Sequence, residues 1–204
     1  MGEQTEPPFL RLASASPRRR QLLDLIGVPH VVTPADIDET PRADEAADDY
    51  VCRLAREKST AVWTKNNDLP VLAADTTVVI DDEILGKPES EADAARMLKL
   101  LSGREHFVYT GVALHSSRGV RVSLSKSSVT FALLHDAQIH AYWASGEPAG
   151  KAGAYAIQGF GGAFVANLAG SYTGVMGLPL YETAVLLRNA GIPVWNGGFH
   201  GNAP

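Results

Sequence analysis

The sequence has little of several features that define large classes of protein. Its 204 residues include one cysteine, Cys52, so no internal disulfide can form, and this composition suits a reducing compartment. No apolar run approaches the roughly 20 residues that a membrane-spanning helix requires. Residues 1–8 contain no basic region followed by an apolar one, so they do not look like a secretory signal. We therefore expect no membrane partner and a cytoplasmic location.

Basic charge is also scarce. Lysine and arginine together number 18 against 23 aspartates and glutamates, which gives a formal net charge of -5. Affinity for duplex nucleic acid comes largely from cations that neutralise phosphates, so we expect no nucleic-acid partner, and any basic patch must be local. The six histidines include no metal-ligand spacing such as His-Glu-x-x-His, which disfavours a zinc hydrolase.

The remaining composition is that of an ordinary soluble globular protein, with 45% hydrophobic and 20% charged residues. No repeat, low-complexity tract or linker interrupts the chain. We therefore predict one domain over residues 9–194, with flexible ends at 1–8 and 195–204, where turn-forming and polar residues gather without periodicity.

Strand and helix patterns alternate along this domain, which predicts an α/β fold. We expect strands at 9–13, near 31, and at 71–74, 76–80, 83–85, 107–115, 120–134 and 163–168. We expect helices at 16–27, from about 44 through 62, and at 90–101, 136–144 and 180–189.

The first candidate site is the segment 14–20, SASPRRR, at a predicted strand-to-helix turn. The free N–H groups and the positive end of a helix can hold a phosphate there. A capped helix with a solvated basic first turn explains this segment equally well. Cations in the first turn of a helix are repelled by the positive end of its dipole, and a bound polyphosphate would remove this repulsion. This favours the anion site.

Lys58 is a second pointer because it shares a helical stripe with the apolar residues Val51, Leu54 and Val62. One reading is that its ammonium reaches past the core to solvent. The other is that the ammonium stays in a cleft, where it needs an anion.

Asp75 is the first choice for a catalytic residue. It follows the apolar run 71–74, and open α/β sheets place ligand sites at the carboxyl ends of buried strands. With a two-residue turn at 81–82, the residue numbers of two paired hairpin positions add up to 163. Thr76 should therefore face Lys87 beside Asp75. The alternative is a purely structural role, in which Asp75 caps the strand and pairs with Lys87.

Glu39 offers a second carboxylate to a hard cation, which prefers oxygen ligands. Three segments, 102–106, 151–159 and 170–179, are dense in glycine and polar residues. Glycine at that density lets backbone approach a ligand closely, although it also marks tight turns.

Taken together, several short motifs resemble the Maf family from about residue 10 to 192. They are Ser14-x-Ser16-Pro17-Arg18-Arg19, Arg56-Glu57-Lys58, Ala74-Asp75-Thr76, Gly86-Lys87-Pro88, Ser102-Gly103-Arg104-x-His106, the segment 151–159 and Gly177-Leu178-Pro179. The resemblance implies a mixed, twisted sheet with flanking helices, in two lobes around a central cleft. It also implies metal-dependent nucleotide pyrophosphatase activity and a homodimer.

Transferred by position, the resemblance assigns roles to individual residues. The catalytic base matches Asp75, and the specificity positions match Arg18, Thr76 and Gln158. Other polar site positions match Ser14, Arg19, Glu39, Lys58 and Lys87. Thr76 and Gln158 look like the branch that acts on dTTP and UTP.

The expected reaction converts a nucleoside triphosphate to the monophosphate and pyrophosphate. We expect Mg²⁺ or Mn²⁺ as cofactor, bound by Glu39 and Asp75 together with phosphate oxygens. The alternative function is a regulator of cell division that binds the nucleotide and hardly turns it over.

Overall fold

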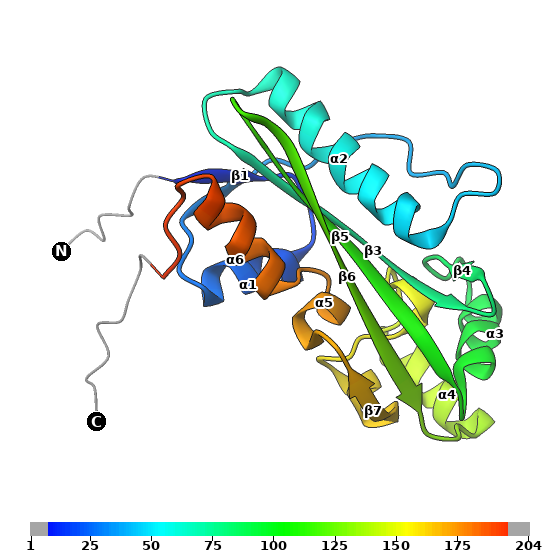
Figure 1. Cartoon of the computed structure of the whole chain (residues 1–204). Helices are drawn as coiled ribbons and strands as arrows, with labels where there is room; N and C mark the ends of the chain where they lie inside the picture. Colours follow the sequence, from blue (N-terminus) through cyan, green and yellow to red (C-terminus); the bar gives the residue numbers. More distant parts are fainter. Residues whose placement is uncertain (1–7, 196–204) are drawn as a thin grey trace, which may run out of the picture.

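One mixed sheet of seven strands forms the frame of the molecule in the computed structural model, which describes residues 8–195 (Figure 1). The strand order is β2-β1-β3-β5-β6-β7, with β4 paired to β3. The strands are β1 (Leu10–Leu12), β2 (His30–Val32), β3 (Val71–Ile80), β4 (Glu83–Leu85), β5 (Glu105–Ser116), β6 (Gly119–Phe131) and β7 (Val165–Ala169). The helices are α1 (Pro17–Leu25), α2 (Ala47–Lys65), α3 (Glu91–Leu101), α4 (Asp136–Ala144), α5 (Tyr172–Met176) and α6 (Leu180–Asn189), with short 3-10 turns η1 (Ala152–Ala154) and η2 (Phe160–Phe164).

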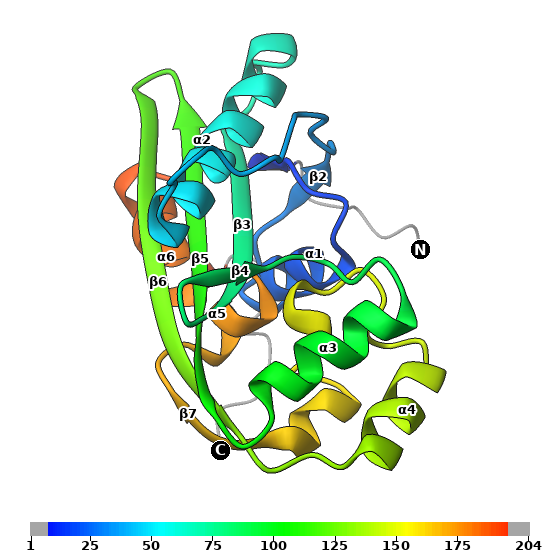
Figure 2. The same ribbon diagram turned by 90° about the vertical axis from the view of Figure 1, so that its right-hand side faces the viewer.

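The long strands β3, β5 and β6 run through the molecule and join two lobes, as the two views in Figures 1 and 2 show. One core cluster gathers α1 and α6 against the first part of β3, for example Leu187 on Leu72. A second cluster gathers α3 and α4 against the other end of the same strands, for example Leu98 and Ile139 near Val78. The two-lobed, mixed-sheet fold that the sequence predicted is therefore present.

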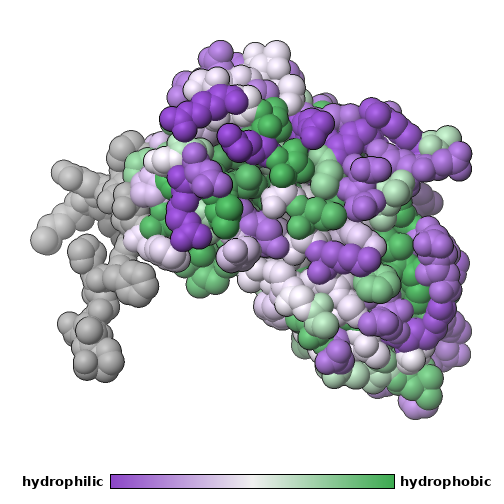
Figure 3. All heavy atoms as spheres, in the orientation of Figure 1, coloured by the Kyte–Doolittle hydropathy of each residue, from purple (hydrophilic) through white to green (hydrophobic). Residues whose placement is uncertain are grey.

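Helix α2 covers the opposite face of the sheet from α6. Its apolar stripe packs on alternate residues of β3, with Val62 against Val71 and Ala73. At Gly111 of β5 the helix comes so close that an added Cβ would lie 2.5 Å from the carbonyl oxygen of Val51. The outer face of α2 and of the loop before it is hydrophilic (Figure 3).

A gap in the edge of β3 positions the candidate site. On this edge β1 pairs with β3 as far as Leu72, and β4 begins to pair at Val78. Within residues 8–195, no strand pairs with residues 73–77 on that side. Asp75 therefore lies in the middle of β3, and the prediction that it ends a strand is wrong. The strand continues because its other edge pairs with β5 without a break, Asp75 opposite Gly111.

The hairpin prediction is partly right. Val78 pairs with Leu85 and Ile80 with Glu83, which is the expected register. However, β4 ends at Leu85, so Lys87 lies beyond the strand and Thr76 pairs with Thr110 of β5 instead.

Other boundaries shift by a few residues. Helix α2 begins at Ala47 rather than near Asp44, which has a left-handed backbone with φ 55°. The predicted flexible ends fall mainly on residues 1–7 and 196–204, which lie outside the described residues. No helix of residues 8–195 has both the length and the apolar character that crossing a membrane requires.

Candidate active site

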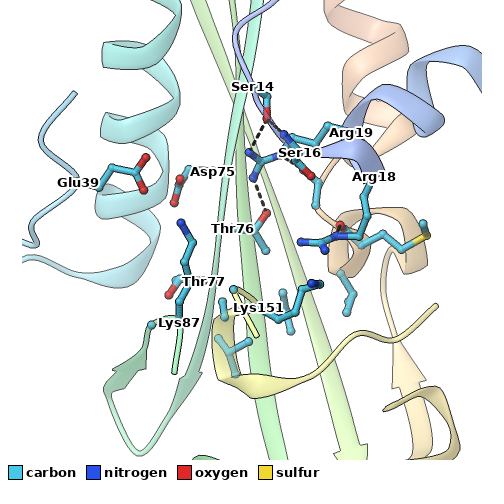
Figure 4. Close-up of a pocket in the computed structure, with 18 of the residues that line it drawn as sticks. Ser14, Ser16, Arg18, Arg19, Glu39, Asp75, Thr76, Thr77, Lys87 and Lys151 are labelled. Carbon is cyan, nitrogen blue, oxygen red and sulfur yellow. Dashed lines mark hydrogen bonds between the residues drawn. The ribbon is translucent and has the colours of Figure 1, made fainter. Parts of the chain in front are cut away.

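A cleft of about 820 Å³ opens at the gap in the edge of β3, between the two lobes (Figure 4). All nine residues singled out from the sequence line it: Ser14, Arg18, Arg19, Glu39, Lys58, Asp75, Thr76, Lys87 and Gln158. They come from six separate parts of the chain, so the fold brings together what the sequence keeps far apart.

Lys58, Asp75 and Glu39 form a compact charged group at one wall. The Lys58 Nζ atom lies 2.6 Å from Asp75 Oδ1 and 2.8 Å from Glu39 Oε1. Lys58 is buried, and the Asp75 side chain is 11% exposed, whereas that of Glu39 is 44% exposed. Of the two readings of Lys58, the paired ammonium is therefore correct. Burial alone would raise the pKa of Glu39, but the hydrogen bond and charge of Lys58 hold that pKa below its usual value.

Arg19 links the turn before α1 to β3 and to the end of α5. Its Nε atom donates to the carbonyl of Gly177 at 2.8 Å, and its two Nη atoms donate to Ser14 Oγ at 3.2 Å and Thr76 Oγ1 at 3.4 Å. Burial lowers the pKa of Arg19, and Asp75 opposes that shift. The guanidinium is thus held by neutral acceptors in a desolvated place, next to one carboxylate.

Arg18 and Lys151 add positive charge on the other side of the cleft. Arg18 donates from Nε to the carbonyl of Met176 at 3.3 Å, and burial lowers its pKa. Burial also lowers the pKa of Lys151, and the charge of Arg18 lowers it further. Two neighbouring cations that line one cleft would each be stabilised by an anion between them.

The remaining predicted residues are two exposed side chains, Lys87 and Gln158, and one hydrogen-bonded hydroxyl, that of Thr76. Lys87 is exposed, and its charge contributes to the lowered pKa of Glu39. Gln158 is exposed on the segment between η1 and η2. Thr76 shares a hydrogen bond of 3.0 Å with Thr110, whose hydroxyl donates to Gly174 at 2.8 Å.

Sequence reasoning missed two features of this site. Tyr50 lines the cleft and donates from its hydroxyl to the backbone carbonyl of Glu39 at 2.9 Å. Burial, with smaller effects from Asp75 and Glu39, raises its pKa to about 12. The second is α5, whose glycine-rich sequence gave no helical signal although it brings Met176 and Gly177 to the two arginines.

His106, which belongs to one of the family motifs, lies behind the cleft rather than in it. It is fully buried, with Nε2 2.9 Å from the hydroxyl of Tyr155, and burial lowers its pKa to about 4. It is therefore a neutral packing residue beneath the cleft wall.

The two carboxylates suit a hard divalent cation. Glu39 and Asp75 already direct one oxygen each at the same ammonium, so their oxygens converge. Among residues 8–195 no group of three or more histidine, cysteine, aspartate or glutamate residues forms a complete metal site. Mg²⁺ is commonly held by one or two carboxylates plus substrate phosphates, and this donor set fits that pattern.

Comparisons with known proteins show the family of this chain. A family model described as Maf-like protein matches residues 9–190. The chain belongs to the Maf family. A relative from Bordetella parapertussis is 56% identical over 198 residues, covering 93% of this chain and 96% of that protein. Relatives from Methylobacillus flagellatus and Nitrosomonas europaea are 53% and 50% identical and cover 90% of this Maf chain, and 93% and 95% of their own lengths. All three are named dTTP/UTP pyrophosphatase.

A solved structure, the Staphylococcus aureus Ham1 protein, is also similar to the Maf chain. It aligns with 16% sequence identity and a TM-score of 0.46, covering 60% of this chain and 71% of that one.

Proposed function

We propose that this Maf protein hydrolyses dTTP and UTP to the monophosphate and pyrophosphate with the help of a divalent metal. The observation that carries the proposal is a buried carboxylate, Asp75, set in a cleft that five cationic side chains line. The names of relatives at 50–56% identity, matched over most of their length, support the pyrimidine triphosphates as substrates.

Binding the polyphosphate is the first task of the site. Arg18, Lys87 and Lys151 line the cleft and can neutralise phosphate oxygens, while the half-buried Arg19 fixes the turn that starts α1. Phosphoryl chemistry leaves little covalent work for a protein, so positioning and charge stabilisation dominate.

Asp75 then orients the attacking water and accepts its proton as the water bonds to the α phosphorus and pyrophosphate leaves. Lys58 donates a hydrogen bond to Oδ1 of Asp75, so Oδ2 is the oxygen that takes up this proton. A metal held by Glu39 and Asp75 supplies Lewis-acid charge to the phosphate oxygens when it is bound.

In this proposal Gln158 reads the base. Its amide can donate to O4 and accept from N3–H of uracil or thymine. Guanine offers an analogous O6 and N1–H edge, so the amide alone does not exclude it, and pocket size must do so.

Pyrophosphate release from UTP, dTTP and GTP tests the proposal. The wild type should turn over the two pyrimidine substrates with Mg²⁺ or Mn²⁺ and lose this activity with a chelator. Asp75→Asn should abolish turnover and leave the fold intact. Near-wild-type activity of that variant excludes the role of Asp75, whereas tight binding without turnover in the wild type favours the regulator of cell division.

We also propose a cytoplasmic homodimer. Family membership supports the dimer, and the single cysteine suits a reducing compartment. Light scattering on the purified protein and fractionation of cells that produce it test the two points.

A further inference from the structure

The segment that presents Gln158 is held at two points, one on each side of that residue. On the near side, the backbone N–H of Ala156 donates to the Tyr142 hydroxyl at 3.1 Å. On the far side, the N–H groups of Phe160 and Gly161 donate to the two oxygens of Glu147, each at 3.0 Å. Both anchors belong to α4 and the turn that follows it, outside the segment itself.

The two anchors are also joined to each other. The Tyr142 hydroxyl donates to Glu147 Oε1 at 2.8 Å, so one hydroxyl and one carboxylate hold three backbone amides. Tyr142 is 4% exposed, and burial together with this bond raises its pKa. Burial would raise the pKa of Glu147, but the Gly161 amide and the other donors hold it below its usual value.

The backbone wraps this pair too closely for side chains. A Cβ added at Gly159 would lie 2.0 Å from Glu147 Oε2, and one added at Gly161 would lie 2.6 Å from the Tyr142 hydroxyl. A side chain at Gly159 would displace the Glu147 carboxylate, and one at Gly161 would also meet the carbonyl oxygen of Ala156 at 2.9 Å. Close approach to the pair therefore favours glycine here, which explains part of the glycine-dense motif without any ligand contact.

Neither Tyr142 nor Glu147 lines the cleft, whereas Ala156 and Gln158 do. In Figure 4 the segment that starts at Lys151 forms the wall of the cleft facing Arg18. We propose that Glu147 and Tyr142 form a clamp that positions Gln158 for contact with the nucleotide base. The inference rests on the proposed function, in which Gln158 reads the base.

The physical reason lies in the irregular backbone of this segment. Residues 155–159 belong to no strand or long helix, so no ladder of backbone hydrogen bonds fixes them. An exposed glutamine on a loose segment would lose conformational freedom when it binds, and that loss weakens binding. Core packing of Tyr155 and Ile157 already restrains the residues before Gln158. The clamp restrains the backbone on both sides of Gln158, so less freedom remains to be lost on binding.

Binding measurements with Glu147→Gln test the clamp. The ligands are a UTP analogue with a methylene group between the α and β phosphorus atoms, and inorganic tripolyphosphate, which has no base. Glutamine keeps the shape of the side chain but loses one acceptor oxygen, so one amide loses its partner. We expect the UTP analogue to bind about tenfold more weakly, since bonds to a charged acceptor contribute this much. The affinity for tripolyphosphate should change less than about twofold.

A double-mutant cycle separates a positioning role from general loosening. In a protein that already carries Gln158→Ala, adding Glu147→Gln should not weaken binding of the UTP analogue any further. Equal losses for both ligands, or effects that add in the double variant, overturn the proposal. Glu91→Gln, an exposed carboxylate paired with His140, is the matched control and should leave both affinities unchanged.

A second variant keeps the test valid if Glu147→Gln does not fold. Tyr142→Phe removes only the hydroxyl, and the same selective loss of the UTP analogue is expected, while an unchanged affinity overturns the proposal. Turnover is measured separately. A wild type without pyrophosphate release refutes the proposed function, and the binding comparison still decides the clamp.

Discussion

Removing the ammonium of Lys58 should destabilise the protein strongly at neutral pH and much less in mild acid. Lys58→Met keeps an unbranched side chain with good helix propensity in α2, so the change is mainly one of charge. It leaves the carboxylates of Glu39 and Asp75 facing each other, because both now contact the same nitrogen, at 2.8 and 2.6 Å.

The size of the effect follows from burial. Breaking a buried ion pair by removing one partner costs about 3–5 kcal/mol. Solvent screens part of the cost here because the Glu39 side chain is 44% exposed, so the lower end, about 3 kcal/mol, applies. For a domain of this size each kcal/mol lowers the melting temperature by about 2–4 °C, so we expect a fall of about 6–12 °C.

Lowering the pH should have opposite effects on this part of the stability in the wild type and in Lys58→Met. In the wild type the pKa of Glu39 is lowered, so its contribution is complete above the ordinary carboxyl pKa and is lost as the pH falls through the lowered value. In the variant, repulsion raises the carboxyl pKa values, so acidification lets one group take up a proton and relieves the repulsion. The difference between the proteins should therefore be largest near pH 8 and shrink toward pH 5.

Thermal unfolding at pH 8 and pH 5 in the presence of a chelator measures both effects. Lys87→Met is the matched control, since Lys87 lines the same cleft but is exposed, and its loss should change stability by less than about 0.5 kcal/mol. A fall below 2 °C at pH 8, or the same fall at both pH values, refutes the reasoning.

Two further predictions concern how the site is held. Gly111→Val should lower the free energy of unfolding by about 2 kcal/mol through overpacking against the backbone of α2. The control Gly86→Val should lower it far less, because no atom lies within 4 Å of the added Cβ. Equal melting temperatures of the two variants contradict this prediction. Arg19→Lys keeps the charge but loses the three-way contact, so kcat/KM for UTP should fall about a hundredfold, as small displacements at a reacting centre do. Arg20→Lys on the exposed side of α1 should have no effect, and a similar loss in both variants rules out a positioning role for Arg19.

Local patterns were enough to predict most of the fold. The apolar stripe of α2, the start of α1 at Pro17 and the serine cap of α3 are set by residues within one or two turns, and each is present. Asp75 shows where such patterns fail. The change from apolar to polar residues resembles a strand end, but β3 continues because β5 pairs with it from Val71 to Val79. Asp75 and its partner Gly111 are 36 positions apart in the sequence.

The same limit applies to the site. Its charged side chains could be predicted from the sequence. An arginine run, a lysine on an apolar stripe and an aspartate beside a buried strand are each locally unusual. Their partners were not visible, because Arg19 and Gly177 are 158 positions apart and only the folded chain brings them together. Tyr142 and Glu147 gave no signal either, since their role depends on where the segment after them folds back.

The charge of the cleft explains why these cations tolerate burial. The chain as a whole carries -5, yet five cationic and three acidic side chains line the cleft, so positive charge is concentrated there. Burial lowers the pKa of Arg18, Arg19 and Lys151, which means that the charged form of each is less stable in the free protein than in water. The first turn of α1 adds to this strain, since it contains arginines and no acidic residue at the positive end of the helix dipole. The negative charge of a bound polyphosphate would offset these costs, because it stabilises the charged form of each cation and interacts favourably with the helix dipole. Ligand should therefore raise the stability of the fold.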